Sequence, residues 1–138
     1  AAQMWGITAA EYLRVADPWP LNPAGELLMG FKPEDQVALQ VIDQTMAVPG
    51  IGMVEWGPAD MMMSFGLIRT PGSSYPQSVT DARDRILEVA RRNNVVFSEV
   101  GTNASNVIER VDDGILFHFA NEEAARIGRE HTGRVMPY

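Results

Sequence analysis

The sequence has 138 residues, of which 46% are hydrophobic and 21% are charged, a composition typical of one globular domain. No stretch approaches the roughly 18–20 apolar residues that a membrane span requires, and no basic segment followed by an apolar one opens the chain. The absence of cysteine excludes disulfides, thiolate metal sites and cysteine nucleophiles, and a net charge of −7 argues against nucleic-acid binding. We expect a cytoplasmic protein.

The chain begins Ala1-Ala2-Gln3 without an initiator Met, so we keep open that it is a piece of something longer. A short helix is predicted after Thr8, since Thr8 and Glu11 have the spacing of a capping box, and Asp17-Pro18 ends it. A stiff extended loop is expected over Trp19–Pro23, because each proline fixes its own φ angle and restrains the preceding residue.

Strands and helices then alternate. Leu27–Phe31 is an unbroken apolar run, as expected of a strand buried on both faces. A helix is predicted over Asp35–Val48, and a second strand over Ile51–Trp56. Gly57-Pro58-Ala59-Asp60 follows as a turn, and a short helix rich in Met comes after it.

The second half of the sequence continues this alternation. The strongest predicted helix is Thr80–Arg92, with Ser78 and Asp81 as its caps. It is followed by a strand, a helix, a strand and a last helix, over Val95–Val100, Ala104–Val111, Ile115–Phe119 and Asn121–His131.

One helix followed by four strand–helix units predicts an α/β fold with a parallel sheet, because such units are joined by right-handed crossovers. Two architectures fit this order: a small doubly wound sheet, or half of a (β/α)8 barrel. A whole barrel takes about 250 residues, so residues 1–138 form at most a partial barrel.

Reactive groups in either architecture lie where the strands end, at their carboxyl edge. Glu34 follows the first strand and Asp60 follows the second. Neighbouring strands lie about 4.8 Å apart, so both carboxylates are able to reach one hard cation such as Mg²⁺ or Mn²⁺. The alternative is that Glu34 and Asp60 only cap the helices that follow them.

Several segments fit one pattern: LLMGFKPED over Leu27–Asp35, AVPGI over Ala47–Ile51, and WGPADMMMSFG over Trp56–Gly66. The pattern resembles the HpcH/HpaI aldolase family, also called the citrate-lyase-like aldolases. The tail Gly128–Tyr138 (GREHTGRVMPY) is similar to the C-terminus of some members. The resemblance covers nearly the whole chain but only the second half of the family's domain.

The resemblance implies that the chain, residues 1–138, is the second half of a TIM barrel, with about four β/α units. It also implies a metal-dependent class II aldolase that cleaves or forms 4-hydroxy-2-oxo acids through a pyruvate enolate, with an aldehyde as the other partner. Glu34 and Asp60 match the family's ligands for a divalent metal, expected to be Mg²⁺, Mn²⁺ or Co²⁺. The backbone of Gly57, Pro58 and Ala59 would hold the carboxylate of the oxo acid.

Two departures from the family bear on the chemistry. The family's Arg and His that bind the oxo acid and move protons belong to the missing first half. The position two before the metal-binding Glu is often Gln in the family, but here it is Lys32, the only lysine in the chain. We interpret Lys32 as a catalytic candidate that offsets the carboxylate charge or binds substrate oxygens. The alternative is a Schiff-base aldolase, which two neighbouring carboxylates disfavour because they keep the amine charged.

Other ionisable residues have simpler interpretations. Glu55, within a predicted strand, is expected to form an interior ion pair, and His118, between two phenylalanines, is expected to be structural. His131 lies in the last helix, away from any strand end.

Two other functions remain open. One is a non-catalytic half-barrel fragment or assembly module that lacks the catalytic Arg and His. The other is a CoA-thioester lyase of the same broad family, although the sequence has no basic cluster for the CoA phosphates. A half-barrel would expose two sheet edges and an apolar face, so we expect a homo-oligomer or association with the missing N-terminal half.

Overall fold

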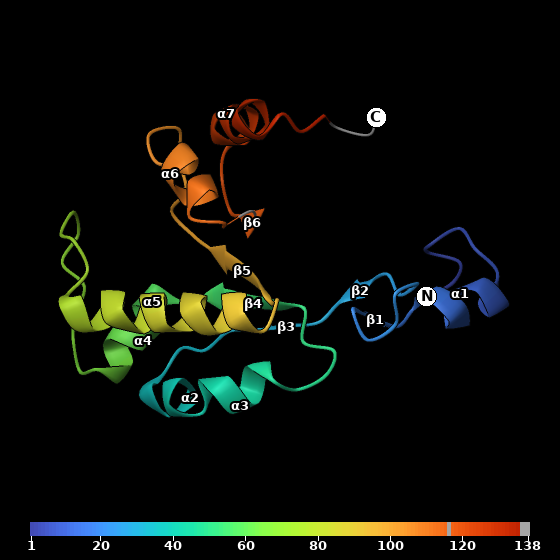
Figure 1. The fold of residues 1–138 in the computed structure, drawn as a ribbon, viewed down its shortest axis with the longest axis horizontal. Helices are drawn as coiled ribbons and strands as arrows, with labels where there is room; N and C mark the ends of the chain where they lie inside the picture. The colour runs from blue at the N-terminus through green and yellow to red at the C-terminus, as the bar shows by residue number, and fades with distance from the viewer. Residues whose placement is uncertain (116, 136–138) are drawn as a thin grey trace.

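The structure, a computed structural model, describes residues 1–115 and 117–135. Its centre is a parallel sheet in the order β3 (Gly30–Phe31), β4 (Met53–Trp56), β5 (Val96–Glu99) and β6 (Phe117–His118) (Figure 1). The strands follow one another across the sheet in sequence order, and each joins its neighbour through at least one helix. This confirms the predicted α/β fold with parallel strands.

The N-terminal residues form a separate unit beside this sheet. Helix α1 (Ala9–Val15) begins at Thr8, whose hydroxyl accepts from the Glu11 amide at 3.2 Å while the Glu11 carboxylate accepts from the Thr8 amide at 2.8 Å. The predicted capping box is therefore confirmed, and its hydrogen bonds lower the pKa of Glu11. The pair β1 (Pro18–Trp19) and β2 (Leu27–Leu28) is also parallel, and Figure 1 shows it extending from the body with α1.

The predicted strand over Leu27–Phe31 is wrong as a single buried element. It divides at Met29 into β2 and β3, which belong to different sheets. Leu28 and Met29 are 44% and 52% exposed, so this segment is not buried on both faces. The hydrophobic run predicted extended structure here, but it did not predict how much of each side chain is exposed to solvent.

The helix predicted over Asp35–Val48 consists of two short helices, α2 (Gln36–Gln40) and α3 (Ile42–Met46), separated at Val41. Asp35 caps the first of them, since its carboxylate accepts from the Ala38 amide at 2.7 Å.

The next two helices differ from the prediction in where they begin. Helix α4 (Pro58–Ser64) takes in Pro58, Ala59 and Asp60, which were expected to form a turn ahead of it. Helix α5 (Gln77–Arg92) starts after Pro76, so the prediction that Ser78 and Asp81 cap it is wrong. Pro76 already places the backbone in an extended conformation, and the helix starts at the next residue.

The last two helices are α6 (Val107–Asp112) and α7 (Glu122–Thr132). Helix α6 begins three residues later than predicted, because the Asn103 side chain accepts from the Ser105 amide at 2.9 Å and holds this segment in a turn. Asn121, predicted as the first residue of the last helix, instead caps α7, since its side chain accepts from the Ala124 amide. The final residues of the motif Gly128–Tyr138, and Leu116 within the fourth predicted strand, lie outside the described residues.

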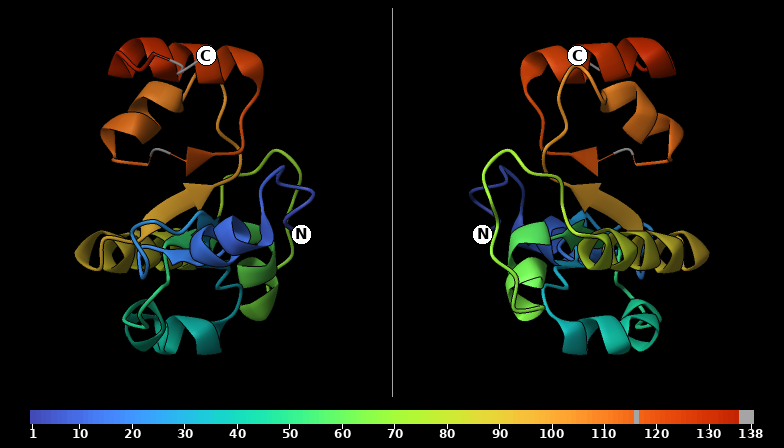
Figure 2. Two further views of the ribbon diagram at one scale, coloured as in Figure 1. Left: turned by 90° about the vertical axis from the view of Figure 1, so that its right-hand side faces the viewer. Right: turned by 90° about the vertical axis from the view of Figure 1, so that its left-hand side faces the viewer.

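The hydrophobic core lies between the sheet and α5. Side chains of β4 that point to this face, Val54 and Trp56, are buried together with Ile86 and Val89 of α5. Figure 2 shows α2 and α3 at one end of the molecule and α6 and α7 at the other. Because strand residues alternate between faces, Met53 and Glu55 point to the opposite, open face of the sheet.

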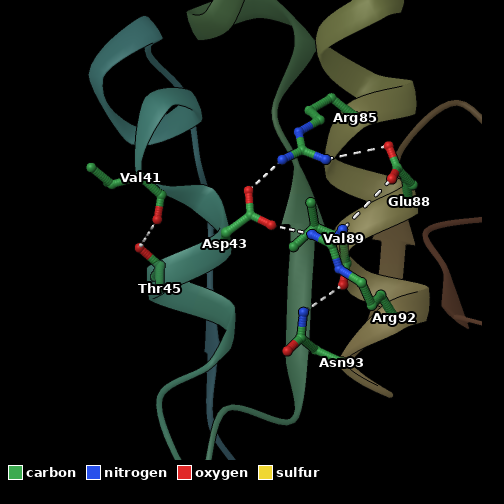
Figure 3. Close-up of polar contacts among 8 residues, drawn as sticks. All are labelled: Val41, Asp43, Thr45, Arg85, Glu88, Val89, Arg92 and Asn93. Carbon is green, nitrogen blue, oxygen red and sulfur yellow. Dashed lines mark hydrogen bonds and ion pairs between the residues drawn. The ribbon is translucent and has the colours of Figure 1, made fainter.

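Charged side chains join α3 to α5 at the surface. The Asp43 carboxylate of α3 accepts from both Arg85 and Arg92 of α5, and Glu88 lies between the two arginines (Figure 3). All four side chains are between 40% and 63% exposed, so this network orients two helices rather than forming part of the core.

A second charged cluster is buried. Glu99, at the end of β5, is 2% exposed, and its carboxylate lies 2.8 Å from Arg83 Nε and 2.9 Å from Arg110 Nε. Burial alone would lower the pKa of Arg83, but its hydrogen bond and attraction to Glu99 raise it. Arg83 belongs to α5 and Arg110 to α6, so this carboxylate fixes two successive helices on one strand.

Among the helices of the described residues, none has the length and apolar character needed to cross a bilayer.

Candidate active site at the ends of β3 and β4

The predicted site residues follow two strands that are direct neighbours in the sheet. Lys32 comes immediately after β3 and Glu34 two residues later, whereas Gly57 comes immediately after β4. The register pairs Phe31 with Val54, so the next residues along, Lys32 and Glu55, share the open face.

Lys32 lies between two carboxylates. Its Nζ atom is 2.9 Å from Glu34 Oε1 and 3.5 Å from Glu55 Oε1. The side chains are 42%, 33% and 22% exposed for Lys32, Glu34 and Glu55, so the cluster is accessible from solvent but not fully hydrated. Glu34 Oε1 is itself shielded from solvent and makes no hydrogen bond within the described residues beyond this ion pair.

The contacts determine the protonation state of Lys32. Its hydrogen bond to Glu34 raises the pKa of the Lys32 ammonium above its ordinary value, and the charges of Glu34 and Glu55 act in the same direction. An ammonium held in this way is a poor nucleophile, because a Schiff base forms only from the neutral amine. The geometry thus supports the interpretation of Lys32 as a charge-balancing group over the Schiff-base alternative.

Gly57 allows the two strand ends to meet. A Cβ atom at this position would lie 2.6 Å from Glu34 Oε1, 2.8 Å from Glu34 Cγ and 3.0 Å from Lys32 Cε. The φ angle of Gly57 is −110°, which any residue adopts, so the space and not the backbone conformation requires glycine. The Glu34 side chain therefore rests directly on the backbone that leads from β4 into α4.

Asp60 is placed in the first turn of α4, three residues after Gly57, and its side chain is exposed. It forms no ion pair or side-chain hydrogen bond with any residue that the structure describes. Pro58 occupies the first position of α4, where its missing N–H costs nothing, and is buried, whereas Ala59 is exposed. Metal binding by Glu34 and Asp60, and substrate binding by Gly57, Pro58 and Ala59, stay predictions.

The donor set can be compared with the needs of a divalent cation. No group of three or more His, Cys, Asp or Glu side chains suited to a metal occurs in residues 1–115 and 117–135. Two carboxylates that leave other positions open nevertheless suit a hard cation that also binds water or substrate. The shielded Glu34 Oε1, which has only an ammonium against it, is the oxygen that a cation would satisfy. The Glu34 carboxylate therefore fits a cation, whereas Asp60 as the second ligand stays a prediction.

Glu55 is the residue whose closeness to the site the sequence did not reveal. Its ion pair is confirmed, but the partner is Lys32, which makes Glu55 a neighbour of the predicted metal ligand. The alternation of β4, with Val54 and Trp56 buried on one face, was the signal that places Glu55 on the other.

The two histidines lie outside this cluster. His118 Nδ1 is 2.9 Å from the hydroxyl of the buried Thr102, consistent with its structural interpretation. His131 Nε2 is 2.7 Å from the Asp112 carboxylate at the surface, between α7 and α6.

Comparison with known proteins gives a consistent result. The sequence model of the family described as HpcH/HpaI aldolase/citrate lyase matches residues 22–121. A search of curated protein sequences found no match.

Solved structures share the fold. They include an HpcH/HpaI aldolase from Desulfitobacterium hafniense, at 18% identity and a TM-score of 0.59, over 96% of this chain and 63% of that one. A family protein from Burkholderia cenocepacia matches at 16% identity and a TM-score of 0.60, over 81% of this chain and 43% of that one. The citrate lyase beta subunit from M. tuberculosis, complexed with oxaloacetate and magnesium, matches at 14% identity and a TM-score of 0.60, over 72% and 50%. The chain thus spans about half the length of the structures it matches.

Proposed function

Because the chain belongs to the HpcH/HpaI aldolase/citrate lyase family, we propose that it is the second half of the (β/α)8 barrel of a metal-dependent class II aldolase. The reaction is the cleavage or formation of a 4-hydroxy-2-oxo acid, with pyruvate and an aldehyde as partners, in the cytoplasm. The observation that carries the proposal is the convergence of Glu34 and Gly57 from adjacent strand ends, with Asp60 one helical turn further on.

Glu34 and Asp60 would hold the divalent cation, either Mg²⁺, Mn²⁺ or Co²⁺. When bound, this cation supplies Lewis-acid chemistry for the 2-oxo acid. A solved relative supports the choice of cation and substrate class, since the citrate lyase beta subunit was crystallised with magnesium and oxaloacetate, which is a 2-oxo acid.

The chain's own residues have separate tasks in this proposal. Gly57 leaves the space in which the Glu34 carboxylate rests, and Pro58 fixes the start of α4. The Ala59 and Asp60 amides, in the first turn of α4, are free of acceptors within that helix and would donate to the substrate carboxylate. Lys32 carries the positive charge nearest to Glu34, so it would also attract the anionic substrate.

The test is pyruvate formation from a panel of 4-hydroxy-2-oxo acids, with and without a chelator. It is run on the 138-residue chain and on a longer polypeptide that carries any preceding residues. Chelation, Glu34→Gln and Asp60→Asn are each expected to lower the rate by at least about 100-fold, because each removes one element of a two-carboxylate metal site. Glu122→Gln, an exposed change on α7, is the matched control and keeps the rate.

Chelator-resistant cleavage that borohydride traps on Lys32 would contradict the metal-dependent mechanism. Cleavage only by the longer polypeptide would instead favour the alternative, in which these 138 residues are a non-catalytic module. The observation that supports this alternative is that the chain covers only about half the length of the matched structures.

A further inference from the structure

We propose that Lys32 is a built-in counter-cation that sets the metal affinity of the site by moving between Glu34 and Glu55. With no metal bound, the ammonium pairs mainly with Glu34. When Glu34 takes a divalent cation, the ammonium is transferred to Glu55. This inference rests on the proposed function, because it assumes that Glu34 is a metal ligand.

Repulsion between two positive charges at one carboxylate is the first argument. Lys32 Nζ lies 2.9 Å from Glu34 Oε1, the solvent-shielded oxygen that also faces Gly57. A divalent cation on the same carboxylate would repel this ammonium. Metal binding at Glu34 therefore favours movement of the Lys32 ammonium away from Glu34.

The second argument is that the displaced ammonium has a place to go. Glu55 Oε1 is 3.5 Å from Lys32 Nζ, within ion-pair distance but further than Glu34. The Lys32 side chain is 42% exposed, so a small movement toward Glu55 meets little packing resistance. Lysine has a flexible four-carbon stem and three rotatable donors, which suits a group that changes partners.

Charge gives the direction of the effect. Glu34 and Glu55 together face one ammonium, so this cluster carries a net charge of −1 with Lys32 charged and −2 without it. A neutral glutamine at position 32 would leave the stronger field for a cation. Lys32 is therefore expected to weaken metal binding, and Glu55 to limit that weakening by accepting the ammonium.

The test is a titration of Mn²⁺ by electron paramagnetic resonance and calorimetry, on the 138-residue chain, three variants of the cluster and one control variant. Lys32→Gln is expected to tighten Mn²⁺ binding by about tenfold or more. Glu55→Gln is expected to weaken it by about tenfold when Lys32 is present, but by less than about threefold in the double variant, because that variant has no ammonium for Glu55 to accept. Glu122→Gln, remote and of equal charge change, is the control and leaves the affinity unchanged.

A second measurement follows the ammonium itself. Lys32 is the only lysine of the chain, so reductive methylation with ¹³C-formaldehyde gives one lysine signal, apart from that of the amino terminus. Adding Mg²⁺ is expected to shift this signal in the chain with Glu34 and to leave it unchanged in Glu34→Gln. Circular dichroism of each variant confirms that it is folded.

The outcomes separate this inference from the proposed function. If Lys32→Gln binds Mn²⁺ no more tightly, or if Glu55→Gln has the same effect in both backgrounds, the counter-cation role is wrong while the metal site stands. If neither the chain nor Lys32→Gln binds Mn²⁺, the metal site itself is wrong, and this inference fails with it.

Discussion

Gly57 is the residue at which one added carbon atom would disturb the candidate site with little effect on the stability of the fold. A Cβ atom there would meet Glu34 Oε1 at 2.6 Å and Lys32 Cε at 3.0 Å, and both belong to flexible side chains. We expect Gly57→Ala to lower Mn²⁺ affinity by about tenfold or more, because Glu34 has to leave its position, whereas unfolding stability changes by less than about 2 kcal/mol. Calorimetry and thermal denaturation measure the two effects.

Gly128→Ala is the matched control for this change. Its Cβ would also be crowded, at 3.1 Å from Val107 Cγ2, but it lies in α7 away from the site. It should leave Mn²⁺ affinity unchanged. Equal loss of affinity in both variants would show that the effect comes from the fold as a whole.

At the scale of elements, α5 is held mainly by its buried face and only slightly by its charged one. Ile86 is fully buried, so Ile86→Ala is expected to cost about 2–5 kcal/mol of unfolding free energy through lost burial and the cavity left behind. Asp43→Asn removes the exposed contacts with Arg85 and Arg92 and is expected to cost less than about 1 kcal/mol.

Urea denaturation of both variants at low and high salt checks this ranking. The smaller effect should shrink further in high salt, since the charges around Asp43 are exposed and screened, whereas the Ile86 effect should not. A loss at Asp43 that equals the loss at Ile86 would mean that the network of Figure 3 supports the fold.

The sequence predicted the elements whose signals are local. The apolar stripe of α5, the capping box of α1 and the alternation of strands with helices all appear in the structure. It failed where tertiary context decides: Leu27–Phe31 looked doubly buried because the apolar run says nothing of which layers cover it. The start of α6 was misplaced because side-chain hydrogen bonds of Asn103 compete with helix formation.

The candidate site was predictable to the same extent. Lys32, Glu34 and Gly57 lie close together because parallel strands end at one edge, whereas the shared cation of Glu34 and Asp60 stays a prediction. The ion pair between Lys32 and Glu55 depends on the register of β3 with β4, because the register sets which side chains lie side by side. The composition of a single strand does not predict this register.

At the scale of the whole molecule, the sheet ends at two unpaired strands among the described residues, β3 and β6. Large apolar side chains are exposed beside β6, with Val100, Phe117 and Phe119 between 45% and 53% accessible. We expect concentration-dependent association of this chain, because such edges and apolar surfaces favour contacts with further strands.

Analytical ultracentrifugation measures this association. Phe119→Ser is expected to weaken it by about tenfold, since an aromatic side chain would leave the contact. Ile68→Ser, at a side chain that is 90% exposed in the loop before α5, is the control and should have little effect. A monodisperse monomer at all concentrations would contradict the expectation.

The shortness of β3 affects how a ligand bound at Glu34 would change the stability of the neighbouring sheet. Its two residues join the sheet through β4 alone, so the segment that carries Lys32 and Glu34 has fewer strand partners than β4, which is paired on both sides. Segments with few backbone partners open most readily. A ligand that bridges Glu34 and Asp60 would thus stabilise the pairing of β3 with β4. Part of its binding free energy would offset the cost of ordering β3.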